Sequence, residues 1–109
     1  MLFPQYLVAA KGNILAMKYS VRNGIVYRRI ANEHFLISVG DAAGICSAIE
    51  QINEGGAYYW KLLEQGEDTE QMLELAAAEY NIEKELLRPG LERYLNELEA
   101  GKYITRNEI

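Results

Sequence analysis

The chain has few of the residues on which many small proteins build their chemistry. Its 109 residues include one cysteine, Cys46, and one histidine, His34. A single cysteine cannot close an internal disulfide, and the pair falls short of the roughly four nitrogen or sulfur ligands that zinc takes. His34 lies beside Glu33, but the chain offers no nucleophile and no orienting group to complete a catalytic set. We therefore expect no metal site, no cofactor and no enzymatic activity.

Long apolar runs are also missing. No stretch is apolar over the length needed to cross a bilayer. The opening MLFPQYLVAA is apolar, but it has no early basic side chain, and Lys11 falls where the apolar region of a signal peptide would continue or end. We therefore expect a cytoplasmic protein with no membrane partner.

Positive charge is scarce. The chain has 16 acidic and 11 basic residues, with a net charge of −5. Proteins that bind duplex nucleic acid depend on Lys and Arg contacts to phosphate, so nucleic acid is a disfavoured partner. Gly55-Gly56 is not followed by the Gly-Lys-Ser/Thr of a phosphate-binding loop. The sequence therefore lacks the phosphate-binding loop, which is the commonest nucleotide-binding motif.

The first half of the chain has the pattern of strands. Asn23-Gly24 is a strong two-residue hairpin signal, because both residues tolerate positive φ. The segments 25–31 and 34–39 are rich in β-branched and aromatic residues, and Asn32-Glu33 between them indicates a second tight turn. The segment from Ile45 to Ile52 is a candidate third strand, although its alternation is imperfect.

The second half has the pattern of helices. Asn53 is a good N-cap for a helix that ends at Gly66. Asp68 or Thr69 caps the next helix, with Gln71 placed to reach back from its first turn. A third helix carries its apolar face on Leu87, Leu91, Tyr94, Leu95 and Leu98. Because Pro89 removes one backbone donor, we expect this helix to start near Pro89, after a separate turn over residues 83–87.

Strands followed by helices predict an α+β domain of winged-helix type, with a three-stranded antiparallel sheet followed by three helices. Gly55-Gly56 stands directly before the only tryptophan, Trp60. We interpret the glycines as the first turn of a helix that packs closely on the preceding strand, with Trp60 in the core.

The segment INEGGAYYWKLLEQGEDTEQMLELAAAEYNIEKE resembles the family of coenzyme PQQ (pyrroloquinoline quinone) synthesis protein D, PqqD. The family pattern is matched in order by Ile52, Asn53, Glu54, Gly56, Ala57, Trp60, Leu63, Gly66, Thr69 and Tyr80. Upstream, NGIVYRRIANEHFLISVGDAAG is similar to the strand–turn–strand that precedes this pattern. The resemblance covers residues 17–103.

The resemblance implies a RiPP recognition element, where RiPP means a ribosomally synthesised and post-translationally modified peptide. Such domains are non-catalytic peptide chaperones. They bind the leader segment of a precursor peptide, which adds as a strand to the third strand in a groove against the third helix. They present the core to a modifying enzyme, often a radical SAM (S-adenosylmethionine) protein. An exposed strand edge suits this role, because it offers unpaired backbone groups.

Mapped onto this chain, the resemblance implies a receiving edge and a facing helix wall. The edge comprises Ile45, Cys46, Ser47, Ala48, Ile49, Glu50 and Gln51, and the wall comprises Leu87, Arg88, Leu91, Tyr94 and Leu98. Some of these leucines must be core, whereas we expect Tyr94 and Arg93 to face outward. Arg88 and Arg93 either pair with acidic leader residues or form a solvated face. A proline at Ala48 is expected to remove a donor that the peptide would use.

Other expectations concern organisation and partners. We predict an N-terminal extension over residues 1–16, which is either a β-hairpin or an overlong start, a peptide-recognition domain over 17–104 and a tail over 105–109. Where family members have Asp-Val at the start of the third helix, this chain has Gly90-Leu91. A winged-helix DNA-binding regulator is the alternative function. Tyr58 and Arg28-Arg29 are candidates for docking on the enzyme, and both a monomer and a homodimer stay open.

Overall fold

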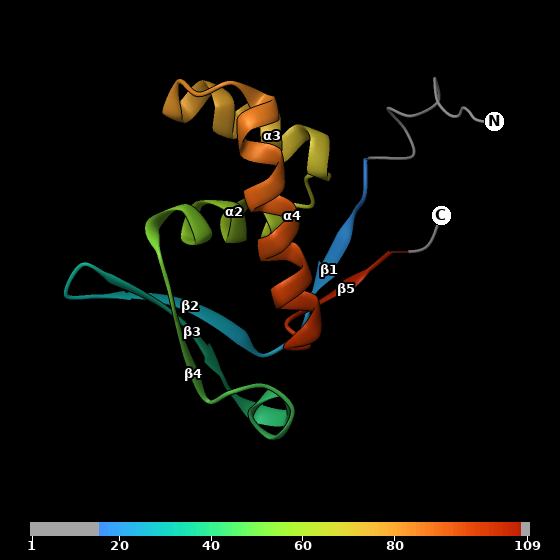
Figure 1. Cartoon of the computed structure of the whole chain (residues 1–109). Coiled ribbons are helices and arrows are strands. Elements are labelled where there is room, and N and C mark those ends of the chain that lie inside the picture. The colour runs from blue at the N-terminus through green and yellow to red at the C-terminus, as the bar shows by residue number, and fades with distance from the viewer. Residues whose placement is uncertain (1–15, 108–109) are drawn as a thin grey trace.

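A computed structural model describes residues 16–107, and it confirms the predicted α+β fold class (Figure 1). Three antiparallel strands are followed by three helices, with a further strand at each end of the described chain. The elements are β1 (Tyr19–Val21), β2 (Ile25–Ile30), β3 (Glu33–Ser38), the 3₁₀ helix η1 (Gly40–Gly44), β4 (Ile49–Ile52), α2 (Glu54–Glu64), α3 (Thr69–Tyr80), α4 (Lys84–Ala100) and β5 (Ile104–Arg106). Except for Ala16, the predicted N-terminal extension lies outside the described residues.

The central sheet has the strand order β2-β3-β4, and both pairs are antiparallel. The turn between β2 and β3 is made by Ala31 and Asn32, which have φ values of 51° and 67°. Two consecutive left-handed residues are typical of a tight hairpin turn that matches the twist of its strands. The turn comes one residue earlier than predicted, because Glu33 pairs with Ile30 as part of the ladder.

The turn at Asn23-Gly24 does not close the predicted hairpin. The strand before it, β1, pairs with β5 near the other end of the chain, with Tyr19 opposite Arg106. Gly24 has a φ of 93°, and a Cβ at this position would lie 2.7 Å from the carbonyl oxygen of Val39. The glycine therefore directs the chain from one sheet into the other. The sequence prediction did not include β5.

The third strand of the sheet is shorter than predicted, because β4 begins at Ile49 and not at Ile45. The backbone N–H groups of Ile45 and Cys46 both donate to the carbonyl oxygen of Ala42, at 3.0 and 2.9 Å. These bonds continue the turn of η1, so the chain cannot extend until after it. Cys46 is buried in this turn, and its thiol contacts the carbonyl oxygen of Lys102 at 3.5 Å.

The first two predicted helices are confirmed with their caps. The side chain of Asn53 accepts a hydrogen bond from the N–H of Gly56, which satisfies one free donor at the start of α2. Asp68 and Gln71 form a reciprocal capping box at the start of α3. The helix α3 ends at Asn81, which adopts the left-handed conformation.

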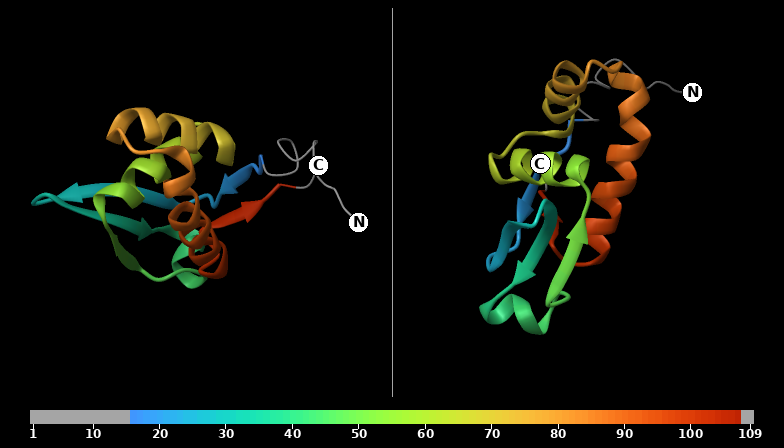
Figure 2. Two further views of the ribbon diagram at one scale, coloured as in Figure 1. Left: turned by 45° about the horizontal axis from the view of Figure 1, so that its top comes forward. Right: turned by 90° about the vertical axis from the view of Figure 1, so that its left-hand side faces the viewer.

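The third helix differs from the prediction, because α4 is continuous from Lys84 and holds Pro89 inside it (Figure 2). A proline inside a helix removes one backbone donor and usually kinks or ends the helix, but α4 continues through Pro89. Side-chain hydrogen bonds connect the first turns of α4 to each other and to α3. The guanidinium of Arg88 donates to Glu85, one turn earlier in α4, and to Glu70 on α3. These bonds offset the lost backbone bond.

The core lies between the sheet and the helices. Its least exposed large side chains are Trp60, Leu36, Met72, Leu73 and Leu91. The predicted core position of Trp60 is therefore confirmed, at 0% exposure. The prediction that the two glycines let the helix pack closely on the preceding strand is wrong. The close neighbours of Gly56 are Tyr94 on α4 and the cap residue Asn53. Within residues 16–107, no helix has the length and apolarity to cross a membrane.

Candidate functional site

The strand β4 has one open edge, since β3 is its only partner strand among the described residues. The N–H of Ser38 donates to the carbonyl oxygen of Ala48 at 3.0 Å, so the backbone groups of Ala48 face β3. In an antiparallel ladder the direction of these groups alternates from residue to residue. The N–H and C=O groups of Ile49 and Gln51 therefore point away from β3, toward the open edge.

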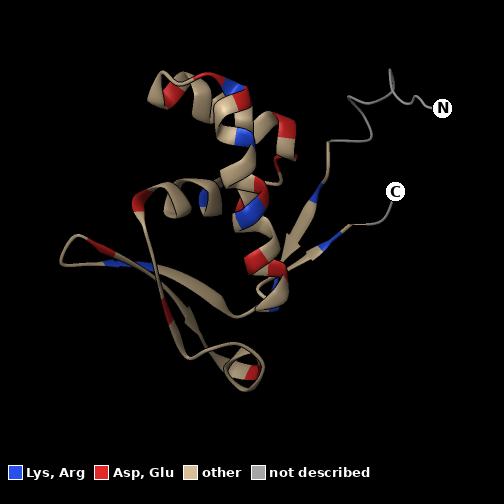
Figure 3. Cartoon of the chain, viewed as in Figure 1, with Lys and Arg blue, Asp and Glu red and all other residues tan. Residues whose placement is uncertain are grey.

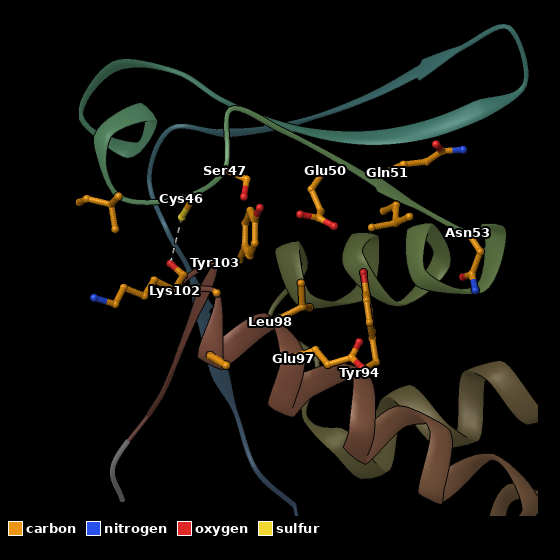
Figure 4. A pocket seen from close by; sticks show the side chains of 14 residues that line it. Cys46, Ser47, Glu50, Gln51, Asn53, Tyr94, Glu97, Leu98, Lys102 and Tyr103 are labelled. Carbon is orange, nitrogen blue, oxygen red and sulfur yellow. Dashed lines mark hydrogen bonds between the residues drawn. The ribbon is translucent and has the colours of Figure 1, made fainter.

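A groove of about 530 Å³ runs between this edge and the C-terminal half of α4 (Figure 4). The segment from Ile45 to Asn53 contributes one side, and α4 with the turn that follows it contributes the other. The groove is lined by Ile45, Cys46, Ser47, Glu50, Gln51, Ile52, Asn53, Tyr94, Glu97, Leu98, Ala100, Gly101, Lys102 and Tyr103.

The helix side of the groove is built on one face of α4. Tyr94, Glu97 and Leu98 are spaced three and four residues apart, so they lie next to one another on the helix surface. The expectation that Tyr94 faces outward is wrong in part, because its ring is half-buried and its hydroxyl donates to the carbonyl oxygen of Gly56 at 2.9 Å. Burial, and to a smaller extent the nearby carboxylate of Glu97, raises the pKa of the Tyr94 hydroxyl far above its usual value.

One end of the groove is closed by the turn after α4. The N–H of Tyr103 donates to the carbonyl oxygen of Leu98 at 2.9 Å, which turns the chain back across the end of the helix. Tyr103 is buried, and its hydroxyl faces Ser47 and Glu50 without a hydrogen bond of normal geometry to either (Figure 4). Burial raises the pKa of this hydroxyl, and the charge of Glu50 adds to the effect.

The groove has its own charge pattern. Its ionisable side chains include the carboxylates of Glu50 on β4 and Glu97 on α4, and the ammonium group of Lys102 at the closed end. Neither carboxylate forms an ion pair within residues 16–107. Acidic positions are visible on both β4 and the last turns of α4 (Figure 3). The middle of the groove is therefore negative.

The structure brings together most, but not all, of the residues predicted for the site. Ile45, Cys46, Ser47, Glu50, Gln51, Tyr94 and Leu98 line the groove. Ala48 and Ile49 belong to the same segment without lining it, and the side chain of Ile49 is 56% exposed. The binding role of each of these residues stays a prediction.

Three predicted wall residues lie away from the groove. Leu91 is a core residue with 1% exposure. The sequence alone could not decide whether this leucine belongs to the core or to the groove. Leu87 lies nearer the start of α4, beside a separate hollow. Arg88 is held by Glu70 and Glu85, so its guanidinium is committed to ion pairs within the chain.

Sequence reasoning missed the other residues that line the groove. These are Ile52, Asn53, Glu97, Ala100, Gly101, Lys102 and Tyr103. Helical spacing from Tyr94 was a sufficient signal for Glu97. No local pattern indicates the position of Tyr103, because it depends on how the chain turns after α4. Across the part of the chain that the structure describes, no group of three or more His, Cys, Asp or Glu side chains is arranged to hold a metal ion.

The fold and the groove define a class of small α+β domains in which the open edge of a three-stranded sheet and a long helix border one elongated site. The chain belongs to the family of coenzyme PQQ synthesis protein D (PqqD), whose family model matches residues 33–104. No curated protein matches the chain. A solved structure described as "TbiB1 in Complex with the TbiA(beta) Leader Peptide" is similar in fold, with 20% identity and a TM-score of 0.64. The match covers 78% of this chain and 93% of that one.

Proposed function

We propose that this protein binds the leader segment of a ribosomally synthesised precursor peptide and presents the core of that peptide to a modifying enzyme. In this proposal the leader adds as a strand to the open edge of β4, and the protein has no catalytic activity of its own. The observation that carries the proposal is the groove between that edge and α4, which is bordered by unpaired backbone groups on one side and side chains on the other.

Strand addition divides binding into two physical contributions. The outward N–H and C=O groups of Ile49 and Gln51 supply main-chain hydrogen bonds, which are the same for every peptide sequence. Alternate side chains of the added strand point into the groove, against Tyr94 and Leu98, and these contacts give specificity. An edge of four residues is short, so the helix wall has to contribute a large part of the contact.

The family match and the similar solved structure support this proposal. PqqD is by its description a protein of coenzyme PQQ synthesis, and TbiB1 was solved in complex with a leader peptide. The strand–helix groove of this chain is of a shape that an extended peptide segment can occupy. The proposal extends leader-peptide binding from that complex to this chain.

The enzyme partner is proposed to dock on a different surface. The β2–β3 hairpin carries exposed Arg28 and Arg29, and Arg29 lines a hollow together with the partly exposed Tyr58 of α2. A radical SAM protein or another RiPP-modifying enzyme is the class of partner that the family suggests. With the leader on β4, this second surface stays accessible.

The exposed surface of α4 argues against the alternative of a DNA-binding regulator. Glu92, Glu97 and Glu99 are on this helix, and the guanidinium of Arg88 is already paired. A helix with this charge would be repelled by phosphates. A gel-shift assay with nonspecific duplex DNA at low salt should therefore show no complex.

The proposal is tested by an amide NMR titration of the intact chain with synthetic leader segments of short precursor peptides encoded close to its gene. We expect shifts at Ile49, Gln51 and residues 94–103, with the amides of α3 unchanged. Scrambled leader sequences serve as the control. A folded sample that shows no shifts with any leader segment, or shifts confined to the β2–β3 hairpin, would contradict the proposal.

A further inference from the structure

We infer that the groove selects leader peptides that carry a lysine or arginine opposite Glu50, with the basic side chain running between Glu50 and Glu97. The inference rests on the proposed function, because it specifies the class of peptide that the groove accepts. It draws on the direction of the β4 side chains, on the pairing of the acidic residues and on the apolar surface between them.

The first step follows from strand geometry. Glu50 is opposite Leu36, which is fully buried, so both side chains lie on the face of the sheet that the helices cover. A strand added at the open edge places the side chain opposite Glu50 on this same face. That peptide side chain therefore enters the groove between β4 and α4. Its neighbours in the peptide sequence point to the other face.

The second step concerns charge. In Figure 4 the side chain of Glu50 points from β4 toward α4, whereas that of Glu97 runs along α4 and ends beside the ring of Tyr94 on the same groove wall. Some acidic residues of the helices are paired, Glu70 with Arg88 and Lys84 and Glu99 with Arg106, whereas exposed ones such as Glu64 and Glu92 are not paired within residues 16–107. Glu50 and Glu97 form no ion pair within the described chain. An incoming peptide removes water from both carboxylates, and a cation offsets that cost.

The third step concerns the shape of the space between the two carboxylates. The partly exposed Tyr94 and Ile52 present apolar surface in this part of the groove, and Leu98, which also lines it, is a core residue with 4% exposure. Lysine and arginine have apolar stems that cover such a surface while the charged end reaches polar groups. An acidic side chain would be repelled by Glu50 and Glu97. A purely apolar one would cover the carboxylates and leave them without a partner.

A further observation is independent of the charges. Tyr103 is only 5% exposed, and its buried hydroxyl has no hydrogen-bond partner of normal geometry within residues 16–107. It lines the same groove and faces Glu50 and Ser47 (Figure 4). Buried hydroxyl groups normally have a partner, and a tyrosine hydroxyl can both donate and accept a hydrogen bond. The ammonium or guanidinium group of the proposed basic residue would be a partner that donates to the hydroxyl oxygen.

The test uses a random twelve-residue peptide library, displayed and selected on the intact protein. The wild-type chain is compared with the charge-reversed variant Glu50→Lys/Glu97→Lys. A matched control, Glu64→Lys/Glu92→Lys, makes the same change of net charge at two exposed glutamates that do not line the groove. Selected peptides are then resynthesised, and their affinities are measured at low and high salt.

We expect the wild type and the control to enrich Lys or Arg at one fixed position, and the charge-reversed variant to enrich Asp or Glu there. The affinity of a basic peptide should fall roughly tenfold or more on charge reversal, and the loss should shrink at high salt. If the reversed variant does not fold, Glu50→Gln/Glu97→Gln replaces it and should lose the basic preference.

Two kinds of result would overturn the inference, and they differ in whether the proposed function also fails. Wild-type selection of peptides without a basic preference, or a preference that charge reversal leaves unchanged, would refute it while leaving the proposed function intact. Failure of the folded wild type to enrich any peptide would refute both.

Discussion

The hydroxyl of Tyr94 on α4 donates a hydrogen bond to the carbonyl oxygen of Gly56 in the first turn of α2, at 2.9 Å. A Cβ at Gly56 would lie 3.1 Å from the oxygen of this hydroxyl and 3.2 Å from Oδ1 of the cap residue Asn53. The absence of a side chain at Gly56 therefore lets the helix wall of the groove approach the end of β4. This contact links the α2 cap to the geometry of the site.

We predict that Gly56→Ala destabilises the protein by about 1 kcal/mol, although alanine is the better helix former. The added methyl group must displace either the half-buried ring of Tyr94 or the cap of α2. Urea unfolding measures the effect. The matched control is Gly55→Ala, whose Cβ would make only an ordinary contact, 3.7 Å from Asn53 Oδ1. We expect the control to be neutral or stabilising, and equal losses in both variants would contradict the close-packing argument.

Proline substitutions on β4 distinguish its two edges. The expectation that a proline at Ala48 removes a donor used by the peptide is not supported, because the backbone groups of Ala48 face β3. We now expect Ile49→Pro to stay folded and to lose peptide binding at least tenfold, since its N–H faces the open edge. Ala48→Pro should instead weaken the sheet and lower the stability. Peptide titrations and thermal melts of both variants provide the measurement, and tight peptide binding by Ile49→Pro would argue against strand addition.

The ion pairs between α3 and α4 predict a pH dependence of stability. Hydrogen bonds from Arg88, and secondarily Lys84, lower the pKa of Glu70 below its ordinary value near 4.5, although burial opposes them. The unfolded chain thus binds this proton at a higher pH than the folded chain. Glu70 therefore contributes stability above its unfolded pKa, and this contribution is lost as the pH falls through the lowered value.

Glu70→Gln should accordingly cost roughly 1 kcal/mol of unfolding free energy at pH 7, and this cost should shrink as the pH falls below the ordinary glutamate value and through the lowered pKa. Glu74→Gln is the control, because its carboxylate is largely exposed and lies 3.6 Å from Lys84. Chemical denaturation across this pH range measures both. A loss for Glu70→Gln that does not change with pH would show that the charge is not the cause.

Trp60 is the largest side chain with no exposure, and Trp60→Ala should cost about 3–5 kcal/mol. Such a loss is a large part of the stability of a domain of this size. Circular dichroism with thermal denaturation tests the prediction. A stable Trp60→Ala variant that fails only in peptide binding would show that the ring serves the groove and not the core.

Local signals in the sequence were sufficient for the order and class of the elements. Asn53 and the pair Asp68 and Gln71 mark helix starts, because their side chains satisfy the free N–H groups of the first turn. Trp60 on α2 and Leu73 on α3 each belong to an apolar face with helical spacing, and both are in the core. These signals act over a few residues, so they are readable without knowing the rest of the fold.

The sequence predictions were wrong where a long-range contact outweighed a local preference. Asn23-Gly24 forms a turn, but β1 pairs with β5, about eighty residues away. Pro89 lies inside α4, whose neighbouring Arg88 forms an ion pair with Glu70 on α3.

The sequence by itself therefore determined the fold class and most of the strand side of the groove, since both depend on periodicity and capping. Only the tertiary structure decided which edge groups are free and which leucines of α4 are core. It also brought Glu97 and Tyr103 into one groove with Glu50. The reason is physical: hydrogen-bond direction and burial depend on neighbours that are brought close by folding, and these neighbours are distant along the chain.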